Sequence, residues 1–451
     1  MSEHLTPPEL EAFLTGSLSP GRFKQVVRHL ITGCPDCCET AGPGFELLEA
    51  IDAEEPLFLA DQEGYDEAID RAFRSVGKRR RHFRREMTRS RETARLLESG
   101  TGLKGLVDEG DRALKGLGDL KALLDRSWAM RHENPREMVS LARAAVEVAR
   151  RLDPRQLGIN YHADIQSQVW GELGNALRVA DDLEEAERAF GVAFEFLVQG
   201  TGDLYLKARL NDLHASFLGT RRRFVLAFSS LDVAHLTYLE IGEPHMAGRA
   251  MLTKAIYTYY KGDPIEALRL NEEGLKLINE NRDPSLLAFA LHNQLSFLVG
   301  CGRFPDAKRE LFDIRPRLER TGCGGAISAL KMRWLQGQIG AGLQEWQSAE
   351  LAFQEVRNGF EEAGMGFAAA LVSFELSLLL LRQNRYEEAK EVALDSAEVF
   401  TALRAEREVL GALLVVQDSF RMNKATVDLL EDFVNFLKRF QIDPDAKFAP
   451  R

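Results

Sequence analysis

Two cysteines and two histidines near the start of the chain have the types and order of a zinc site. Cys34 and Cys37 bound a Cys-Pro-Asp-Cys turn that is tight enough for both sulfurs to face one ion. A closed tetrahedral zinc site needs two further nitrogen or sulfur ligands. His29 lies about one helical turn before Cys34, and His4 precedes His29 by a further 24 intervening residues. We therefore expect these four residues to bind a structural Zn²⁺ ion; the alternative is that the cysteines are free thiols and the histidines incidental.

Short helices must position these ligands. Residues 6–16 carry apolar side chains on one helical face and begin at Thr-Pro, and residues 21–33 repeat the pattern and end at a glycine. A third helix is expected over 43–51. The Cys turn follows the second helix directly, and His4 can fold back alongside it.

The pattern resembles the zinc-binding domain of anti-sigma factors in ligand type, ligand order and the long first spacing. It differs by one residue, because four residues separate His29 from Cys34 where the family usually has three, which makes Cys38 an alternative ligand. The resemblance implies that a sigma factor contacts the apolar faces of residues 10–14 and 23–30. Redox sensing by the zinc-bound thiolates is a further option that part of the family uses.

A helical hairpin recurs through the rest of the chain. The clearest copy, residues 167–198, places small residues at Gly174 and Ala186 where two helices would cross, and it resembles the tetratricopeptide repeat. An alanine with the same preceding turn recurs every 40 to 42 residues. These marker alanines are Ala186, Ala227, Ala267, Ala307, Ala349 and Ala389. Such hairpins bury their apolar faces only by stacking on one another.

The sequence thus predicts an all-α protein, a tetratricopeptide-type right-handed solenoid of about eight helical hairpins with a small zinc-stabilised helical domain at its N-terminal end. Residues 126–153 are expected to open the array and residues 407–440 to close it. The expected division is 1–75 for the zinc domain, 76–119 for a basic helix and glycine-rich connector, 120–440 for the solenoid and 441–451 for a tail.

The concave face of such an array is the expected binding groove. If the first helix of each hairpin lines it, aligning the copies brings a set of polar side chains there. They are Asn175, Arg178, Arg209, Asp212, Arg249, Tyr259, His292, Lys331 and Gln338, with Trp334 beside them. The cations would suit an acidic peptide segment or a C-terminal carboxylate, through charge-assisted hydrogen bonds. The alternative is that they only solvate an exposed face. The four tryptophans, Trp128, Trp170, Trp334 and Trp346, are expected to be core residues.

Composition narrows the classes of partner. A net charge of −11 argues against direct nucleic-acid binding, although residues 78–91 form one strongly basic run. We interpret that run as a solvated connector helix; the alternative is a helix that binds nucleic acid or an acidic partner. No apolar stretch is long enough to cross a membrane, and the first residues do not form a secretion signal. The five cysteines do not form a disulfide framework, so we expect a cytoplasmic protein.

Catalytic motifs are missing from the sequence. It contains no phosphate-binding glycine loop, no GxSxG and no HExxH, so we expect no enzyme activity. The leading hypothesis is a regulatory protein in which the zinc domain binds a sigma factor and the solenoid binds a protein or peptide that acts as a signal in transcription regulation. The alternative is a tetratricopeptide scaffold in a multiprotein assembly, with a purely structural zinc domain.

Overall fold

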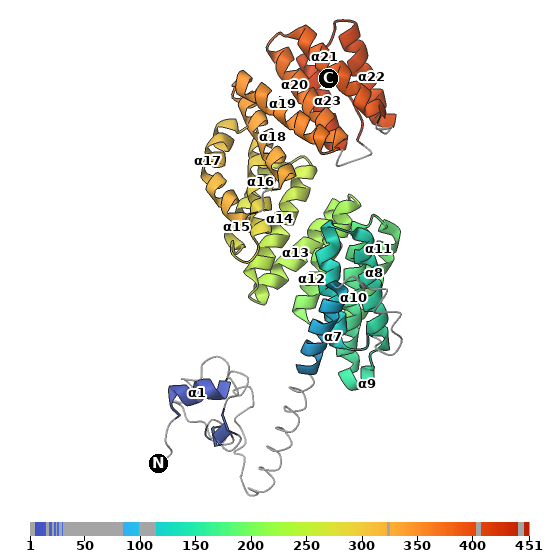
Figure 1. Ribbon diagram of the computed structural model, residues 1–451, viewed down its shortest axis with the longest axis vertical. Coiled ribbons are helices and arrows are strands. Elements are labelled where there is room, and N and C mark those ends of the chain that lie inside the picture. The colour runs from blue at the N-terminus through green and yellow to red at the C-terminus, as the bar shows by residue number, and fades with distance from the viewer. Residues whose placement is uncertain are drawn as a thin grey trace. The chain divides into compact units, whose positions relative to one another are not determined.

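The computed structural model describes residues 5–14, several positions between 18 and 29, residues 84–98, 114–322, 325–402, 407–440 and 446–450. The chain divides into two compact units, Met1–Arg89 and Ser90–Arg451. Every regular element within the described ranges is helical (Figure 1). In those ranges no helix combines the length and the apolar character needed to cross a bilayer.

The first unit contains α1 (Pro7–Leu14), which begins at the proline that the sequence indicated. A pair of aromatic rings holds α1 against the segment that follows, because Phe13 and Phe23 have centroids 4.7 Å apart. Glu9 on α1 accepts hydrogen bonds from Arg22 at 2.6 and 2.9 Å. His4, Cys34, Cys37 and Cys38 lie outside the described residues.

The second unit is built from helical hairpins. Its regular elements are α7 (Leu117–Ala129), η3 (Met130–His132), α8 (Pro135–Arg151), α9 (Pro154–Leu157), α10 (Ile159–Val179), α11 (Leu183–Gln199), α12 (Leu204–Thr220), α13 (Phe224–Glu240), α14 (Pro244–Tyr260), α15 (Pro264–Leu277), α16 (Pro284–Gly300), α17 (Phe304–Thr321), α18 (Ala326–Gly342), α19 (Trp346–Glu362), α20 (Gly366–Arg382), α21 (Tyr386–Ala402), α22 (Arg407–Arg421) and α23 (Val427–Phe440). Residues 84–98 are also helical, and Thr93 donates a 2.6 Å hydrogen bond to Asp119 at the start of α7.

The turn inside each hairpin has one repeated geometry. A residue with positive φ stands five positions before each marker alanine, and these residues are Asp181, Arg222, Gly262, Gly302, Gln344 and Asn384. The amide that follows each of them bonds back to a carbonyl five residues earlier, as from Asp182 to Leu177 at 2.9 Å. This left-handed C-cap satisfies the last carbonyls of the first helix and reverses the chain. The positive-φ turn and the marker alanine therefore recur together, at the same offset, in each of these hairpins.

Small residues allow the two helices of a hairpin to cross closely. All six marker alanines are fully buried. A Cβ placed on Gly174 would lie 3.0 Å from the ring of Phe190, so the glycine makes room for that ring. Leu173 and Leu177 are buried around the same crossing. The predicted stacked hairpins are confirmed.

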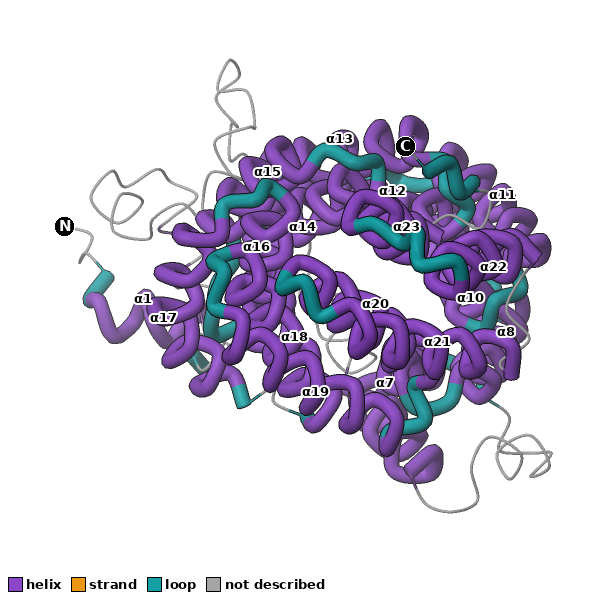
Figure 2. The backbone as a smooth tube through the Cα atoms, turned by 90° about the horizontal axis from the view of Figure 1, so that it is seen from above, coloured by secondary structure: helices purple, strands orange, loops and turns teal. Residues whose placement is uncertain are grey.

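The first helices form the inner face of the array. Helices α10, α12, α14 and α16 each contact the next first helix along the chain, and hydrogen bonds join α18 to α20. The second helices contact mainly the helices next to them in sequence. Figure 2 shows the first helices around a central opening and the second helices α13, α15, α17, α19 and α21 on the outside. Polar side chains on the first helices can therefore meet across the inner face.

The last hairpin is reversed relative to the others. Its second helix, α23, packs beside α20, in the place that a first helix takes elsewhere, while α22 packs against the outer helix α21. The expectation that the first helix of every pair lines the concave face is therefore wrong for this pair. Phe433, Phe436 and Phe440 are buried along α23, which lets one strongly apolar helix close the core of the array.

Candidate binding surface on the inner face

Five of the predicted groove residues come together where α10, α12 and α14 meet. They are Asn175, Arg178, Arg209, Asp212 and Arg249. The side chain of Asp212 is only 3% exposed, and its carboxylate lies 3.8 Å from the guanidinium groups of both Arg209 and Arg249. Buried charges of this kind must be paired to offset the loss of hydration. The ion pairs therefore join α12 to α14 on the inner face.

Trp128, at the end of α7, completes this group. The guanidinium carbons of Arg209, Arg131 and Arg249 lie 4.7, 4.8 and 5.6 Å from the centroid of its indole ring, which is the range of cation–π contact. We call Trp128 with Arg131, Arg178, Arg209 and Arg249 the arginine cluster. Trp128 does pack against the core as expected, but its contacts with arginine were not predicted.

Two carboxylates neutralise only part of the arginine cluster. Arg209 donates two hydrogen bonds to Glu172, at 3.0 and 3.1 Å, and Asp212 lies between Arg209 and Arg249. Arg178 donates two hydrogen bonds, at 2.9 and 3.2 Å, to the neutral amide oxygen of Asn175. Burial lowers the pKa of Arg178, and the nearby Tyr257 and Asp212 act in the opposite direction. Among the described residues, four guanidinium groups therefore face two acids, and Arg178 is desolvated with no carboxylate hydrogen-bonded to it.

A second feature of the inner face is a trough of about 930 Å³ that runs along α16. The C-terminal end of α14, the last turns of α17 and the first turns of α18 form its sides. Its wall surface is mainly apolar, with Ile256, Tyr260, Phe289 and Phe297 among the contributors, and polar and charged side chains complete the wall. The volume is in the range of sites that bind small ligands or peptide side chains. We refer to this cavity as the trough.

Three of the predicted groove residues line the trough. Tyr259 stacks near Phe297 with ring centroids 4.9 Å apart, and burial raises the pKa of its hydroxyl. Burial, assisted by the charge of Lys331, lowers the pKa of His292 to about 4. His292 is therefore neutral near pH 7. Lys331 itself is exposed at the rim.

One polar group of the trough lacks a partner. The side chain of Asn293 is buried, and its amide nitrogen has no hydrogen-bond acceptor among the described residues. Asn293 belongs to the wall of the trough. A buried donor without an acceptor costs free energy. Because this nitrogen is closed to solvent, it is not a contact point for a ligand in this conformation.

The remaining predicted residue, Gln338, belongs to a different group centred on Glu375 of α20. Gln338 donates to both carboxylate oxygens at 2.9 and 3.1 Å, and the indole nitrogen of Trp334 donates to the same carboxylate. Lys438 on α23 forms an ion pair with it. Sequence reasoning missed Glu375 and Lys438, because the reversal of the last hairpin brings Lys438 to the inner face.

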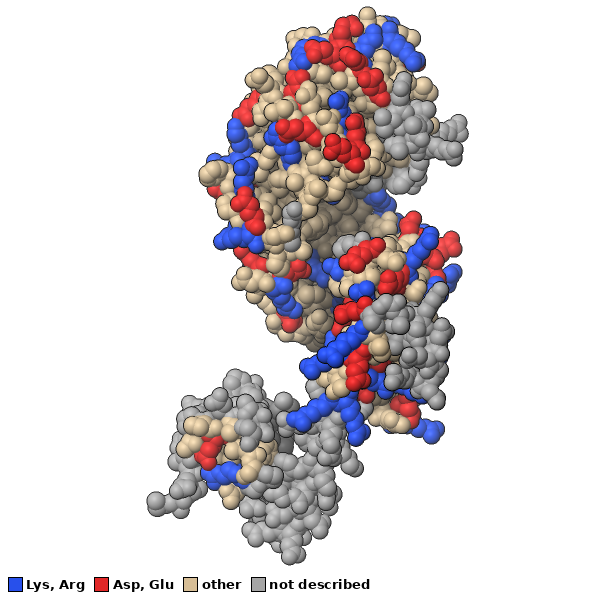
Figure 3. All heavy atoms as spheres, viewed as in Figure 1, with Lys and Arg blue, Asp and Glu red and all other residues tan. Residues whose placement is uncertain are grey.

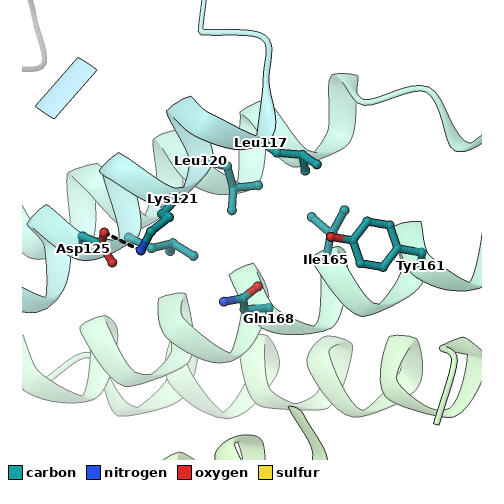
Figure 4. Close-up of a pocket in the computed structure, with 8 residues that line it drawn as sticks. Leu117, Leu120, Lys121, Asp125, Tyr161, Ile165 and Gln168 are labelled. Carbon is teal, nitrogen blue, oxygen red and sulfur yellow. Dashed lines mark hydrogen bonds and ion pairs between the residues drawn. The ribbon is translucent and has the colours of Figure 1, made fainter. Parts of the chain in front are cut away.

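Outside the inner face, the described residues show mixed surface charge and one small cavity. Acidic and basic side chains are interspersed over the visible face of the second unit, with no large area of one sign (Figure 3). A small cavity of about 240 Å³ lies between α7 and α10, where Leu117, Leu120 and Ile165 form an apolar wall (Figure 4). A 2.8 Å ion pair between Lys121 and Asp125 lies at its edge. This cavity is smaller than ordinary ligand sites.

The predicted zinc ligands are not brought together in the part of the chain that the structure describes. His29 is helical and half-buried, and the other ligands fall outside the described residues. Among the residues that are described, no cluster of three or more His, Cys, Asp and Glu side chains could hold a metal. The zinc site stays a prediction.

Comparison with known proteins finds matches among solved structures. No family model matches the chain, and no curated protein matches its sequence. A solved structure, described as the crystal structure of Rap protein complexed with competence and sporulation factor, matches with a TM-score of 0.48 and 12% sequence identity. The match covers 73% of this chain and 88% of that chain.

Proposed function

We propose that the inner face of the solenoid binds a peptide segment of a partner protein. The trough along α16 carries this proposal, because it is a cavity of about 930 Å³ on the inner face with a mainly apolar wall surface. A peptide supplies what such a cavity needs, since its side chains fill apolar space and its carbonyls accept hydrogen bonds. The chain is then an interaction protein rather than an enzyme.

A peptide selection on the intact chain tests this proposal. A displayed library of random 12-residue peptides is selected on the full-length protein, and binders are ranked by fluorescence polarisation. Ala288→Trp fills the trough, and we expect it to weaken selected peptides by at least about tenfold, a loss of about 1.4 kcal/mol. Ala363→Trp, on an exposed residue at the end of α19, is the matched control and should leave binding unchanged. The proposal would be contradicted if the selected peptides bound Ala288→Trp as tightly as the wild type, or if the library gave no binders.

We also propose that the N-terminal domain is a structural zinc domain that binds a sigma factor, so that the solenoid serves a regulator of transcription. The donor set supports it, because two thiolates and two imidazoles are the ligands that closed zinc sites use. The ligands are His4, His29, Cys34 and Cys37, with Cys38 as the alternative. Metal analysis of the full chain should find about one zinc per chain.

The double variant Cys34→Ser with Cys37→Ser should remove that metal, whereas Cys301→Ser, at the end of α16, should retain it. Equal zinc contents in the two variants would exclude these ligands. Capture of a purified sigma factor by the wild type and not by the double variant would support regulation. Equal capture would favour a scaffold with another partner surface.

A further inference from the structure

Resting on the proposed function, we propose that the arginine cluster binds a carboxylate of the same peptide whose apolar side chain enters the trough three to five residues away. The cluster and the trough would then be two subsites of one peptide-binding surface. The ligand class is a short segment that combines one acid with one large apolar residue at a fixed distance.

The charge balance of the arginine cluster favours an anion. Arg209 is already paired with Glu172, but no hydrogen bond from the guanidinium of Arg249 occurs within the part of the chain that the structure describes. Its nearest acid, Asp212, is shared with Arg209 at 3.8 Å, too far for a hydrogen bond. Arg178 donates its side-chain hydrogen bonds to the amide oxygen of Asn175. A carboxylate could accept from the free donors of Arg249 in the planar geometry that guanidinium favours.

The arginine cluster is a better anchor for an acid than the rim of the trough. Lys331 and Arg315 also carry positive charge beside the trough, but both are exposed. Arg333, the third cation of the trough wall, already forms a 2.6 Å ion pair with Glu355. Water and salt screen exposed charges, so ion pairs formed there contribute little. The side chain of Arg249 is only 28% exposed and that of Arg209 18%. A carboxylate between them would interact in a less polar environment and gain more.

The helix geometry sets the distance between the two subsites. Arg249, Ile256 and Tyr260 lie on one face of α14, because steps of 7 and 11 residues return to the same side of a helix. At 1.5 Å per residue, Ile256 and Tyr260 lie about 10 and 16 Å along α14 from Arg249.

The repeat gives a second estimate of the distance. The 40-residue period places Phe289 of α16 at the position that Arg249 has on α14. Neighbouring packed helices are about 8–10 Å apart. An extended peptide advances about 3.3 Å per residue, so the route along α14 spans about three to five residues and the route across to α16 about three.

The peptide selection tests the spacing when it is repeated on two variants of the full chain. Wild-type binders should contain Asp, Glu or a free C-terminus three to five residues from a large apolar residue. Selection on Arg249→Gln should keep the apolar residue and lose the acid. Arg269→Gln, on the outer helix α15, is the matched control and should return the wild-type pattern. Amidated peptides then distinguish a C-terminal carboxylate from a side-chain carboxylate.

A double-mutant cycle measures the contact itself. Replacing the acid of a selected peptide by its amide should weaken binding to the wild type by about 10- to 100-fold and to Arg249→Gln by less than about threefold. Binders that depend on the trough but have no acid, or an acid that is equally important in Arg249→Gln, would overturn the inference and leave the proposed function intact. Peptides that bind Ala288→Trp as tightly as the wild type would contradict both the inference and the proposed function.

Discussion

Lys438 on α23 forms an ion pair with Glu375 on α20, and this contact fastens the closing helix to the inner face of the array. The side chain of Glu375 is 7% exposed, and it also accepts hydrogen bonds from Trp334 and Gln338 on α18. Three helices that are distant in sequence thus converge on one buried carboxylate. The stability of this end of the array depends on keeping that charge compensated.

Removing the lysine should loosen the closing helix. Lys438→Met leaves the carboxylate of Glu375 buried with two neutral donors and no cation. Because Lys438 is itself partly exposed, we expect a loss of about 1–2 kcal/mol rather than the larger cost of breaking a fully buried pair. Native-state hydrogen exchange should show faster exchange in α20 and α23. Lys424→Met, at an exposed site, should exchange as the wild type does; equal rates in both variants would contradict the role of the pair.

Two glycines in helices should respond to alanine with opposite signs. A Cβ on Gly248 would lie 2.8 Å from the carbonyl oxygen of Gly274, a backbone atom that cannot move aside cheaply. A Cβ on Gly191, in the middle of α11, would meet nothing within 4 Å. Gly248→Ala should therefore destabilise the protein by about 1–3 kcal/mol, whereas Gly191→Ala should stabilise it by about 0.5–1 kcal/mol.

Urea denaturation followed by circular dichroism measures both glycine variants. Equal stabilities of Gly248→Ala and Gly191→Ala would show that the packing of α14 on α15 does not require a glycine at position 248. A gain from Gly191→Ala alone would reflect helix propensity and the reduced freedom of the unfolded chain.

The sequence predicted the repeat but not every contact that the repeat makes. The marker alanines and their spacing were sufficient for the stacked hairpins, because each hairpin has the same crossing. Arg178, Arg209, Arg249 and Asp212 were predicted on one face for the same reason, whereas Arg131 was not predicted. Trp128 and Glu172 were missed as their partners, since Trp128 belongs to the irregular opening copy and Glu172 was not aligned with the groove.

The remaining misses have physical causes as well. Nothing in the periodicity of α23 distinguishes an inner helix from an outer one, because its apolar stripe suits either place. The trough needs the separation between α16, α17 and α18, which depends on how whole helices pack. The zinc ligands fall outside the described residues, so the resemblance to anti-sigma domains stays a prediction.

Stability should fall between pH 6.5 and pH 4 because two histidines are buried in neutral form. Burial lowers the pKa of His214 to about 4, against the opposing effect of Glu187, while Arg223 adds to the lowering. The unfolded chain binds a proton near pH 6.5 and the folded chain does not, so the stabilisation is complete above that pH and is lost as the pH falls toward 4. We expect a loss of about 1–3 kcal/mol from His214, and His292 should contribute in the same direction.

His214→Phe separates this titration from other acid effects. The ring of His214 lies among Phe190, Phe194 and Phe217, with centroids 5.1 to 5.9 Å away, so phenylalanine fits the same surroundings. Urea denaturation at pH 7.5 and pH 4.5 should show a smaller drop for the variant than for the wild type. An equal loss of unfolding free energy in the two proteins would mean that protonation of His214 does not destabilise the folded state.

Asp212→Asn should change stability and peptide binding in opposite directions. The variant keeps the shape of the side chain but removes the carboxylate that faces Arg209 and Arg249 at 3.8 Å. The folded chain then holds uncompensated guanidinium groups, and we expect a loss of about 1–3 kcal/mol in the free energy of unfolding. The same excess charge should raise the affinity for an acidic peptide and steepen its dependence on salt. Arg249→Gln should weaken that peptide with a smaller effect on folding, because Arg249 is more exposed than Asp212. Urea denaturation and fluorescence polarisation at two salt concentrations measure both quantities, and a variant at position 212 that binds acidic peptide more weakly than the wild type would show that Asp212 itself contacts the ligand.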